Sequence, residues 1–132
     1  KKNYKYKIEE IKLIGERKNN SKIKRKLNFI KESDGNIKKK KYYITVITLK
    51  EKKTISKDSK GDPLKFEIKI LTMFKVRDTE KLLIERKLTK KNIYNNISDK
   101  FKLEQSEKII IENLSEKIAN NIISAITNLN DN

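Results

Sequence analysis

One run of alternating residues limits the possible folds of this chain more than any other feature of the sequence. From Leu64 to Val76 every second residue is apolar or threonine, and lysine or glutamate fills most positions between them. This alternation predicts a long β-strand with one buried and one wet face, as in an antiparallel sheet. Only Leu71 and Met73 interrupt the polar face. Something must therefore cover one side of a sheet.

A second periodic run supplies that cover. Between about residues 103 and 129, a large aliphatic side chain recurs every four residues, at Ile110, Leu114, Ile118, Ile122 and Ile126. This spacing predicts a long amphipathic helix whose apolar stripe lies on the sheet.

Shorter patterns predict the remaining elements. The alternation from Tyr4 to Leu13 slips at residues 9–10, which indicates a strand with a bulge or a change of face. An N-cap at residues 19–21 and a following apolar stripe predict a helix that ends at the turn signal of residues 34–35. The other expected elements are strands over 42–49 and from 82 to 88, a hairpin arm with a solvated tip over 50–62, a turn over 77–80 and a loop over 90–100.

These elements give the order β-α-β-β-β-α in a single domain over residues 1–132. The expected fold class is α+β, with two helices packed on one face of a roughly four-stranded, mostly antiparallel sheet. The other face is expected to be largely wet.

The chain contains neither cysteine nor histidine. It therefore lacks a thiolate nucleophile, a cysteine metal site, and the commonest general base and metal ligand. Its serines have no histidine to activate them, and its three glycines are too isolated to form a phosphate-binding loop. We expect no enzymatic activity, no catalytic residue, no metal and no cofactor.

The positive charge is concentrated in the first half of the chain. The net charge is +16, of which residues 1–60 hold +14, from 21 basic and 7 acidic residues. An excess of this kind favours an anionic partner, such as nucleic acid, an anionic lipid headgroup or a phosphorylated glycolipid. Thirty of the 34 basic residues are lysine, and a chain rich in Lys, Ile and Asn is also typical of an A/T-biased coding sequence.

Local charge density alone selects the candidate anion-binding residues. The first set lies on the expected hairpin arm, and the second set precedes the strand that leads into it. They are Lys50, Lys52, Lys53, Lys57 and Lys60, followed by Lys38, Lys39, Lys40 and Lys41.

The run from Tyr42 to Leu129 resembles the LptE family of lipopolysaccharide-assembly lipoproteins. The resemblance is carried by Gly61-Asp62-Pro63-Leu64 opening the long strand, by Tyr94-Asn95, and by Leu114-Ser115-Glu116-Lys117-Ile118-Ala119-Asn120-Asn121-Ile122 in the last helix. It covers about two-thirds of the chain, as a match of element order and pattern more than of signature residues.

This resemblance implies a lipoprotein at the periplasmic face of the outer membrane, seated in a large β-barrel partner, LptD. The pair delivers lipopolysaccharide to the cell surface, and the small protein acts as plug, assembly aid and glycolipid-binding element without catalysing a reaction. It also implies a membrane anchor on a lipidated N-terminal cysteine, which this chain lacks.

Two other functions remain open from the residues. The first is a basic nucleic-acid-binding module, with stacking platforms at Tyr4, Tyr6, Tyr42 and Tyr43, although tyrosines at this spacing are also typical of core-edge packing. The second is an adaptor whose charge is incidental. A hydrophobic export segment ending in cysteine in the full-length gene would favour the lipoprotein.

Overall fold

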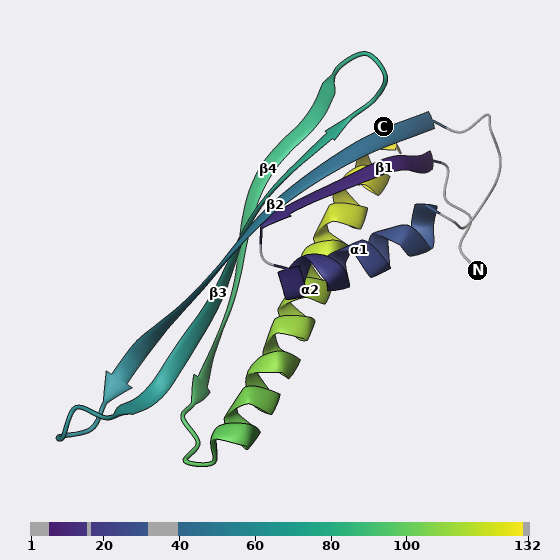
Figure 1. Cartoon of the computed structure of the whole chain (residues 1–132). Coiled ribbons are helices and arrows are strands. Elements are labelled where there is room, and N and C mark those ends of the chain that lie inside the picture. The colour runs from purple at the N-terminus through teal and green to yellow at the C-terminus, as the bar shows by residue number, and fades with distance from the viewer. Residues whose placement is uncertain (1–5, 16, 32–39, 131–132) are drawn as a thin grey trace.

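The computed structural model describes residues 6–15, 17–31 and 40–130 (Figure 1). The expected order β-α-β-β-β-α and the α+β class are confirmed. The elements are β1 (Tyr6–Gly15), α1 (Arg17–Lys31), β2 (Lys40–Lys57), β3 (Pro63–Arg77), β4 (Leu82–Asn95) and α2 (Lys100–Asn130).

The four strands form one sheet in the order β1-β2-β3-β4. β2, β3 and β4 are joined by hairpins and pair antiparallel, whereas β1 pairs parallel to β2. A parallel pair needs a crossover connection, and α1 lies in that connection. The sheet is therefore mostly antiparallel, with one parallel strand at its edge.

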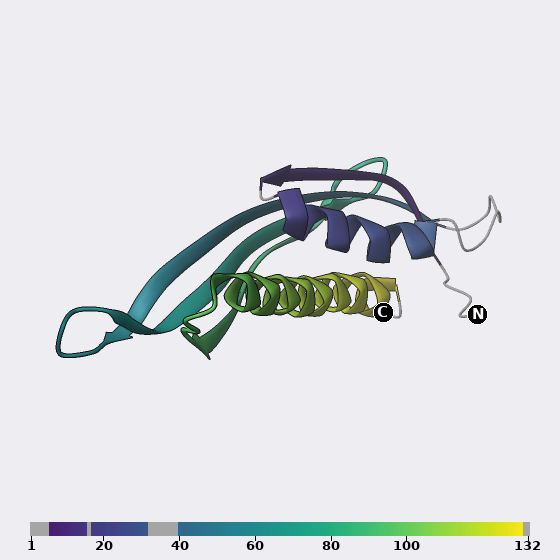
Figure 2. The same ribbon diagram turned by 60° about the horizontal axis from the view of Figure 1, so that its bottom comes forward.

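Both helices lie on the same side of the curved sheet (Figure 2), as the apolar patterns predict. The core fills the space between the two layers, and its largest fully buried side chains come from the periodic positions of β2, β3 and α2 and from β1 and α1. They are Ile8, Ile23, Leu27, Tyr42, Ile44, Val46, Ile70, Phe74, Val76, Ile118, Ile122 and Ile126. No helix in the described part of the chain is both long and apolar enough to cross a bilayer.

The start of α1 differs from the prediction. The helix begins at Arg17, not after an N-cap at residues 19–21. Gly15 ends β1 with φ +112°, and a Cβ there would lie 1.9 Å from the carbonyl oxygen of Thr48, so the turn needs glycine and starts the helix early. Asn20 is instead buried inside the helix, where its Oδ1 accepts a hydrogen bond from Thr48 Oγ1 at 2.8 Å. The predicted stop signal at residues 34–35 lies outside the described residues.

The predicted loop over residues 90–100 is wrong for its first half. β4 continues to Asn95 because its backbone pairs with β3 as far as Lys65. This ladder overrides the low strand propensity of lysine and asparagine. The connection to α2 is short, and Asp99 caps the helix, its Oδ1 accepting hydrogen bonds from the amides of Phe101 at 3.0 Å and Lys102 at 3.3 Å.

Two smaller predictions are confirmed. The register of β1 against β2 shifts between Ile8 and Glu10, at the predicted interruption. The predicted turn after β3 is built by Asp78, whose Oδ1 accepts hydrogen bonds from the amides of Glu80 at 2.7 Å and Lys81 at 2.8 Å. These backbone hydrogen bonds, donated first by Lys81 and then by Glu80, hold the pKa of the Asp78 carboxyl below its ordinary value.

Candidate functional site

The predicted hairpin arm is a β-ladder with a closed tip. β2 and β3 stay paired out to Lys57 opposite Pro63, and Figure 1 shows this hairpin projecting past the rest of the molecule. Asp58 builds the tip, because its Oδ1 accepts hydrogen bonds from the amides of Lys60 and Asp62, each at 2.9 Å. Gly61 supplies the positive φ of +89° that the turn requires. Leu64 lies on the arm and is 48% exposed, although its periodicity predicts a buried side chain.

Two of the five arm lysines are engaged within the protein. Lys52 Nζ lies 2.7 Å from Glu107 Oε2 on α2 and 4.3 Å from the centre of the Phe66 ring. Lys53 Nζ lies 3.6 Å from Oε1 of Glu67, a carboxylate only 6% exposed. These two lysines therefore have less freedom than the others to meet an external anion.

The remaining arm lysines are exposed: Lys50, Lys57 and Lys60. In the described part of the chain no ion pair involves any of them.

The second predicted set lies far from the arm. Lys40 and Lys41 are exposed at the start of β2, roughly 55 Å along the strand from Lys57 at the usual rise per residue. Lys38 and Lys39 lie outside the described residues. The two predicted sets thus do not form one surface.

The fold adds basic residues that local charge density did not select. Lys65, Lys69 and Lys91 lie on the sheet face turned away from the helices, here called the open face, and Lys69 stands directly opposite Lys91. Like charges in direct cross-strand register destabilise a sheet, and Glu51 of β2, which stands opposite Lys69 on its other side, offsets part of this repulsion. The alternation of Lys65 and Lys69 with the buried Ile68 and Ile70 predicts that these two lysines lie on the open face. Only the register of β4 against β3 shows that Lys91 lies beside Lys69.

The open face also carries an apolar groove. Its walls include Ile47, Leu49, Leu71 and Met73, with Lys87 at one side, and it encloses about 290 Å³. Leu49 is opposite Leu71 and 58% exposed. The expectation of a largely wet face is therefore wrong at this point, where Leu71 and Met73 interrupt the polar alternation.

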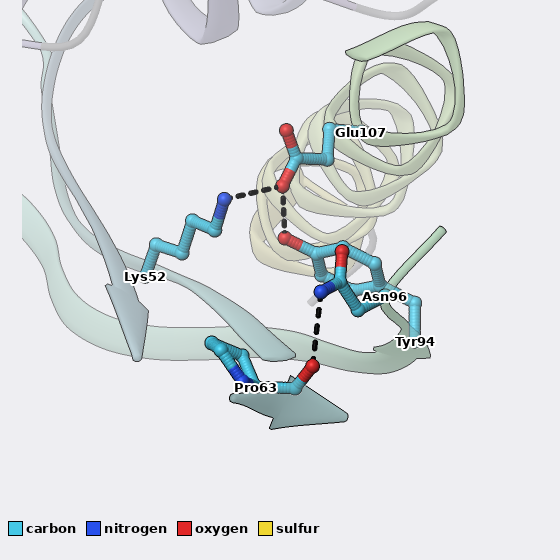
Figure 3. A network of polar contacts seen from close by, with 5 residues as sticks. All are labelled: Lys52, Pro63, Tyr94, Asn96 and Glu107. Atoms are coloured by element: carbon cyan, nitrogen blue, oxygen red, sulfur yellow. Dashed lines mark hydrogen bonds and ion pairs between the residues drawn. The ribbon is translucent and has the colours of Figure 1, made fainter. Parts of the chain in front are cut away.

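A polar network joins the base of the arm to α2 (Figure 3). Tyr94 Oη donates a hydrogen bond to Glu107 Oε2, which also pairs with Lys52. Next to them, Asn96 Nδ2 donates to the carbonyl oxygen of Pro63 at 2.9 Å. Sequence reasoning missed this network because it placed Tyr94 in a loop.

The network shifts the acidities of two groups. Burial raises the pKa of Glu107, but hydrogen bonds from Lys52 and Tyr94 and the charges of Lys52 and Lys50 outweigh it and hold that pKa below its ordinary value. Burial first, and then the Glu107 carboxylate, raise the pKa of the Tyr94 phenol, which stays a hydrogen-bond donor at neutral pH. Glu107 is therefore an anion that fixes the arm to the helix layer.

The tyrosines proposed as stacking platforms are part of the packing instead. Tyr6 and Tyr42 are 2% and 1% exposed, with ring centres 5.7 Å apart. Tyr43 is covered by the Arg77 guanidinium, 4.4 Å from its ring centre. Tyr4 lies outside the described residues. Core packing, the alternative reading of this pattern, is confirmed for Tyr6 and Tyr42.

No protein-family model matches the chain, and no curated protein matches it in sequence. The fold, by contrast, is shared with solved lipoprotein structures. Rare lipoprotein B from Shewanella oneidensis is 17% identical, with a TM-score of 0.62 over 92% of this chain and 98% of that one. Lipoprotein B from Nitrosomonas europaea is 11% identical, with a TM-score of 0.67 over 96% and 86%. A minor lipoprotein from Acinetobacter baumannii is 16% identical, with a TM-score of 0.57 over 88% and 91%. At these identities the likeness is one of fold.

Proposed function

We propose that this protein is an LptE-like component of outer-membrane lipopolysaccharide assembly, without enzymatic activity. The observation that carries the proposal is the fold, which corresponds to a solved rare lipoprotein B over nearly the whole of both chains. The sequence resemblance from Tyr42 to Leu129, a match of element order and pattern, supports the LptE family, and the fold comparison supports a lipoprotein. The protein would be lipid-anchored in its full-length form, at the periplasmic face of the outer membrane.

Lipopolysaccharide is the proposed ligand because the open face offers both kinds of contact that it needs. Lipopolysaccharide carries phosphates and carboxylates together with acyl chains. The lysine ammonium groups of Lys65, Lys69 and Lys91 can donate charge-assisted hydrogen bonds to the anionic groups. The groove between Leu49 and Leu71 can cover part of an acyl chain, which gains about 0.8 kcal/mol per buried methylene.

A β-barrel partner of the LptD type is proposed from the shape and charge of the arm. The hairpin from Lys50 to Lys65 projects beyond the helices and has an exposed, charged tip at residues 58–62. The lumen of a large barrel is polar, so a plug with charged loops and a mostly polar sheet face can sit in it. The Glu107 network would hold the arm at a fixed angle for that purpose.

Nucleic acid remains the rival ligand, now resting on charge alone because Tyr6 and Tyr42 are buried. Salt dependence cannot separate the two polyanions. A substitution in the apolar groove can separate the two ligands, because an acyl chain contacts the groove and a phosphodiester backbone does not.

The test compares three variants for binding of fluorescently labelled lipopolysaccharide and of a labelled oligothymidine. We expect Lys69→Glu and Leu49→Gln each to weaken lipopolysaccharide binding by about fivefold, since each removes one contact of roughly 1 kcal/mol. Lys102→Glu, an exposed lysine on α2, is the matched charge control and should change binding little. Tight oligothymidine binding that Leu49→Gln leaves intact, with no lipopolysaccharide binding, would overturn the proposal in favour of a nucleic-acid module.

A further inference from the structure

The outer edge of β1 offers an unused row of backbone hydrogen-bonding groups. β1 is the last strand of the sheet and pairs with β2 along one edge only. Among the described residues no strand pairs with its other edge. A strand edge of this kind can template the addition of another strand.

A groove runs beside this edge. It encloses about 400 Å³ between β1 and α1, which lie side by side in Figures 1 and 2. Partly buried side chains of β1 contribute its apolar surface, and α1 contributes a polar wall. The residues that line it are Ile11, Leu13, Gly15, Asn20, Ser21 and Lys24. An edge strand flanked by an apolar groove and a helix is suited to bind an extended peptide as an added strand.

The helix that forms the other wall of the groove is strongly basic. α1 carries seven lysine or arginine residues and no aspartate or glutamate in its 15 residues. Lys24 is exposed where it lines the groove, and Lys12 is exposed on the edge strand itself. These charges complement an acidic occupant and disfavour a basic one.

The backbone groups on the outer edge of β1 favour a peptide over other acidic ligands. A strand edge presents alternating N–H donors and carbonyl acceptors, which another peptide backbone can match. A phosphodiester backbone supplies acceptors only, and an acyl chain supplies neither. A second copy of this chain would bring the basic α1 of each copy close to the other, which like-charge repulsion opposes.

We propose that the groove between β1 and α1 binds an extended segment of a partner protein, with alternating apolar and acidic side chains, as an additional strand. The apolar side chains contact Ile11 and Leu13 on the helix side of the sheet, and the acidic ones lie on the opposite side, next to Lys12. This inference rests on the edge strand and α1, not on lipopolysaccharide binding, so either proposal can fail without the other.

The test uses the whole chain and a labelled eight-residue peptide of alternating valine and glutamate. Fluorescence anisotropy gives the affinity, and amide hydrogen exchange locates the bound strand. We expect the peptide to slow exchange of the β1 amides that point away from β2. We expect Lys12→Glu, on the side where the glutamates lie, to weaken binding by about tenfold, as charge reversal at an interface rim does. The matched control, Lys117→Glu, lies on the exposed side of α2 and should leave the affinity unchanged.

Two further peptides separate the contributions of charge and backbone. A peptide with lysine in place of glutamate should bind at least about tenfold more weakly, because its charges repel Lys12 and add to the positive charge of α1. A peptide N-methylated at alternate positions keeps its charges but loses donors, and should also lose affinity and the protection of β1.

Three results would overturn the proposal. The first is binding that Lys12→Glu and N-methylation leave unchanged, which indicates non-specific attraction. The second is protection of the same β1 amides by oligothymidine or lipopolysaccharide but not by the peptide. The third is a dimer of the free protein, seen by sedimentation, whose β1 amides are already protected and which the peptide does not dissociate.

Discussion

Replacing Glu107 with glutamine tests how the arm is held to the helix layer. The substitution Glu107→Gln keeps the shape and the acceptor oxygen but removes the negative charge. The carboxylate now receives a hydrogen bond from Tyr94 and an ion pair from Lys52 at 2.7 Å, and its side chain is only 17% exposed. The Tyr94 hydrogen bond becomes one between neutral groups, and the Lys52 ion pair becomes a hydrogen bond from an ammonium group to a neutral amide oxygen.

The expected loss follows from these two contacts. A hydrogen bond to a charged group contributes about 1.5–3 kcal/mol and a neutral one about 0.5–1.5, so the Tyr94 contact loses about 1 kcal/mol. The Lys52 side chain is 42% exposed, so solvent screening limits its loss to about 0.5 kcal/mol. We expect the free energy of unfolding to fall by about 1.5 kcal/mol in total.

The loss should depend on pH with a defined sign. The pKa of Glu107 is lowered in the folded protein, so its stabilisation is complete above the pKa of an unfolded glutamate, near 4.3, and is lost as the pH falls through the lower folded value. The difference between the parent and Glu107→Gln should therefore be constant from pH 6 to 8 and shrink below about pH 4.

Urea unfolding followed by circular dichroism measures both effects. Glu104→Gln is the control, because Glu104 is exposed one turn earlier on the same helix. An equal effect of the two substitutions at pH 7, or a Glu107→Gln difference that persists at pH 3, would refute the role assigned to Glu107.

Four further substitutions test the core packing, two glycine turns and a helix cap, each by the same urea unfolding measurement. Ile122→Ala removes a side chain with no exposed surface and should cost about 3 kcal/mol. Gly15→Ala should cost more than about 2 kcal/mol or prevent folding, because its Cβ meets the carbonyl of Thr48, whereas Gly61→Ala meets no atom within 4 Å and should cost about 1 kcal/mol from its positive φ alone. Asp99→Ala removes the cap of α2 and should cost about 1 kcal/mol. Equal effects of the two glycine substitutions would contradict the close approach at Thr48.

Patterns that repeat along one element predicted the fold well. The four-residue spacing from Ile110 to Ile126 defines the buried face of α2, and the two-residue alternation to Val76 defines that of β3, because each period reflects one element lying on one core. The predictions failed where pairing with a neighbouring strand determines whether a segment is a strand. Four of residues 90–95 are lysine or asparagine, which have poor strand propensity, and the register with β3 makes the segment a strand.

The candidate site was less predictable for the same reason. Local charge density selected the arm, which the structure shows as a projecting hairpin. It could not show that Lys52 and Lys53 are engaged by carboxylates, because Glu107 lies on a helix 55 residues further along the chain. It also could not show that Lys69 faces Lys91, because that contact depends on strand register.

Recovery of the protein together with its partner would test whether it belongs to an outer-membrane assembly complex. The full-length protein would be expressed in its own cells, the membranes dissolved in mild detergent, and the protein pulled down. The expected result is co-purification of a large, heat-modifiable β-barrel protein from the outer-membrane fraction. Recovery from the cytosol with nucleic acid and without a barrel protein would contradict the claim.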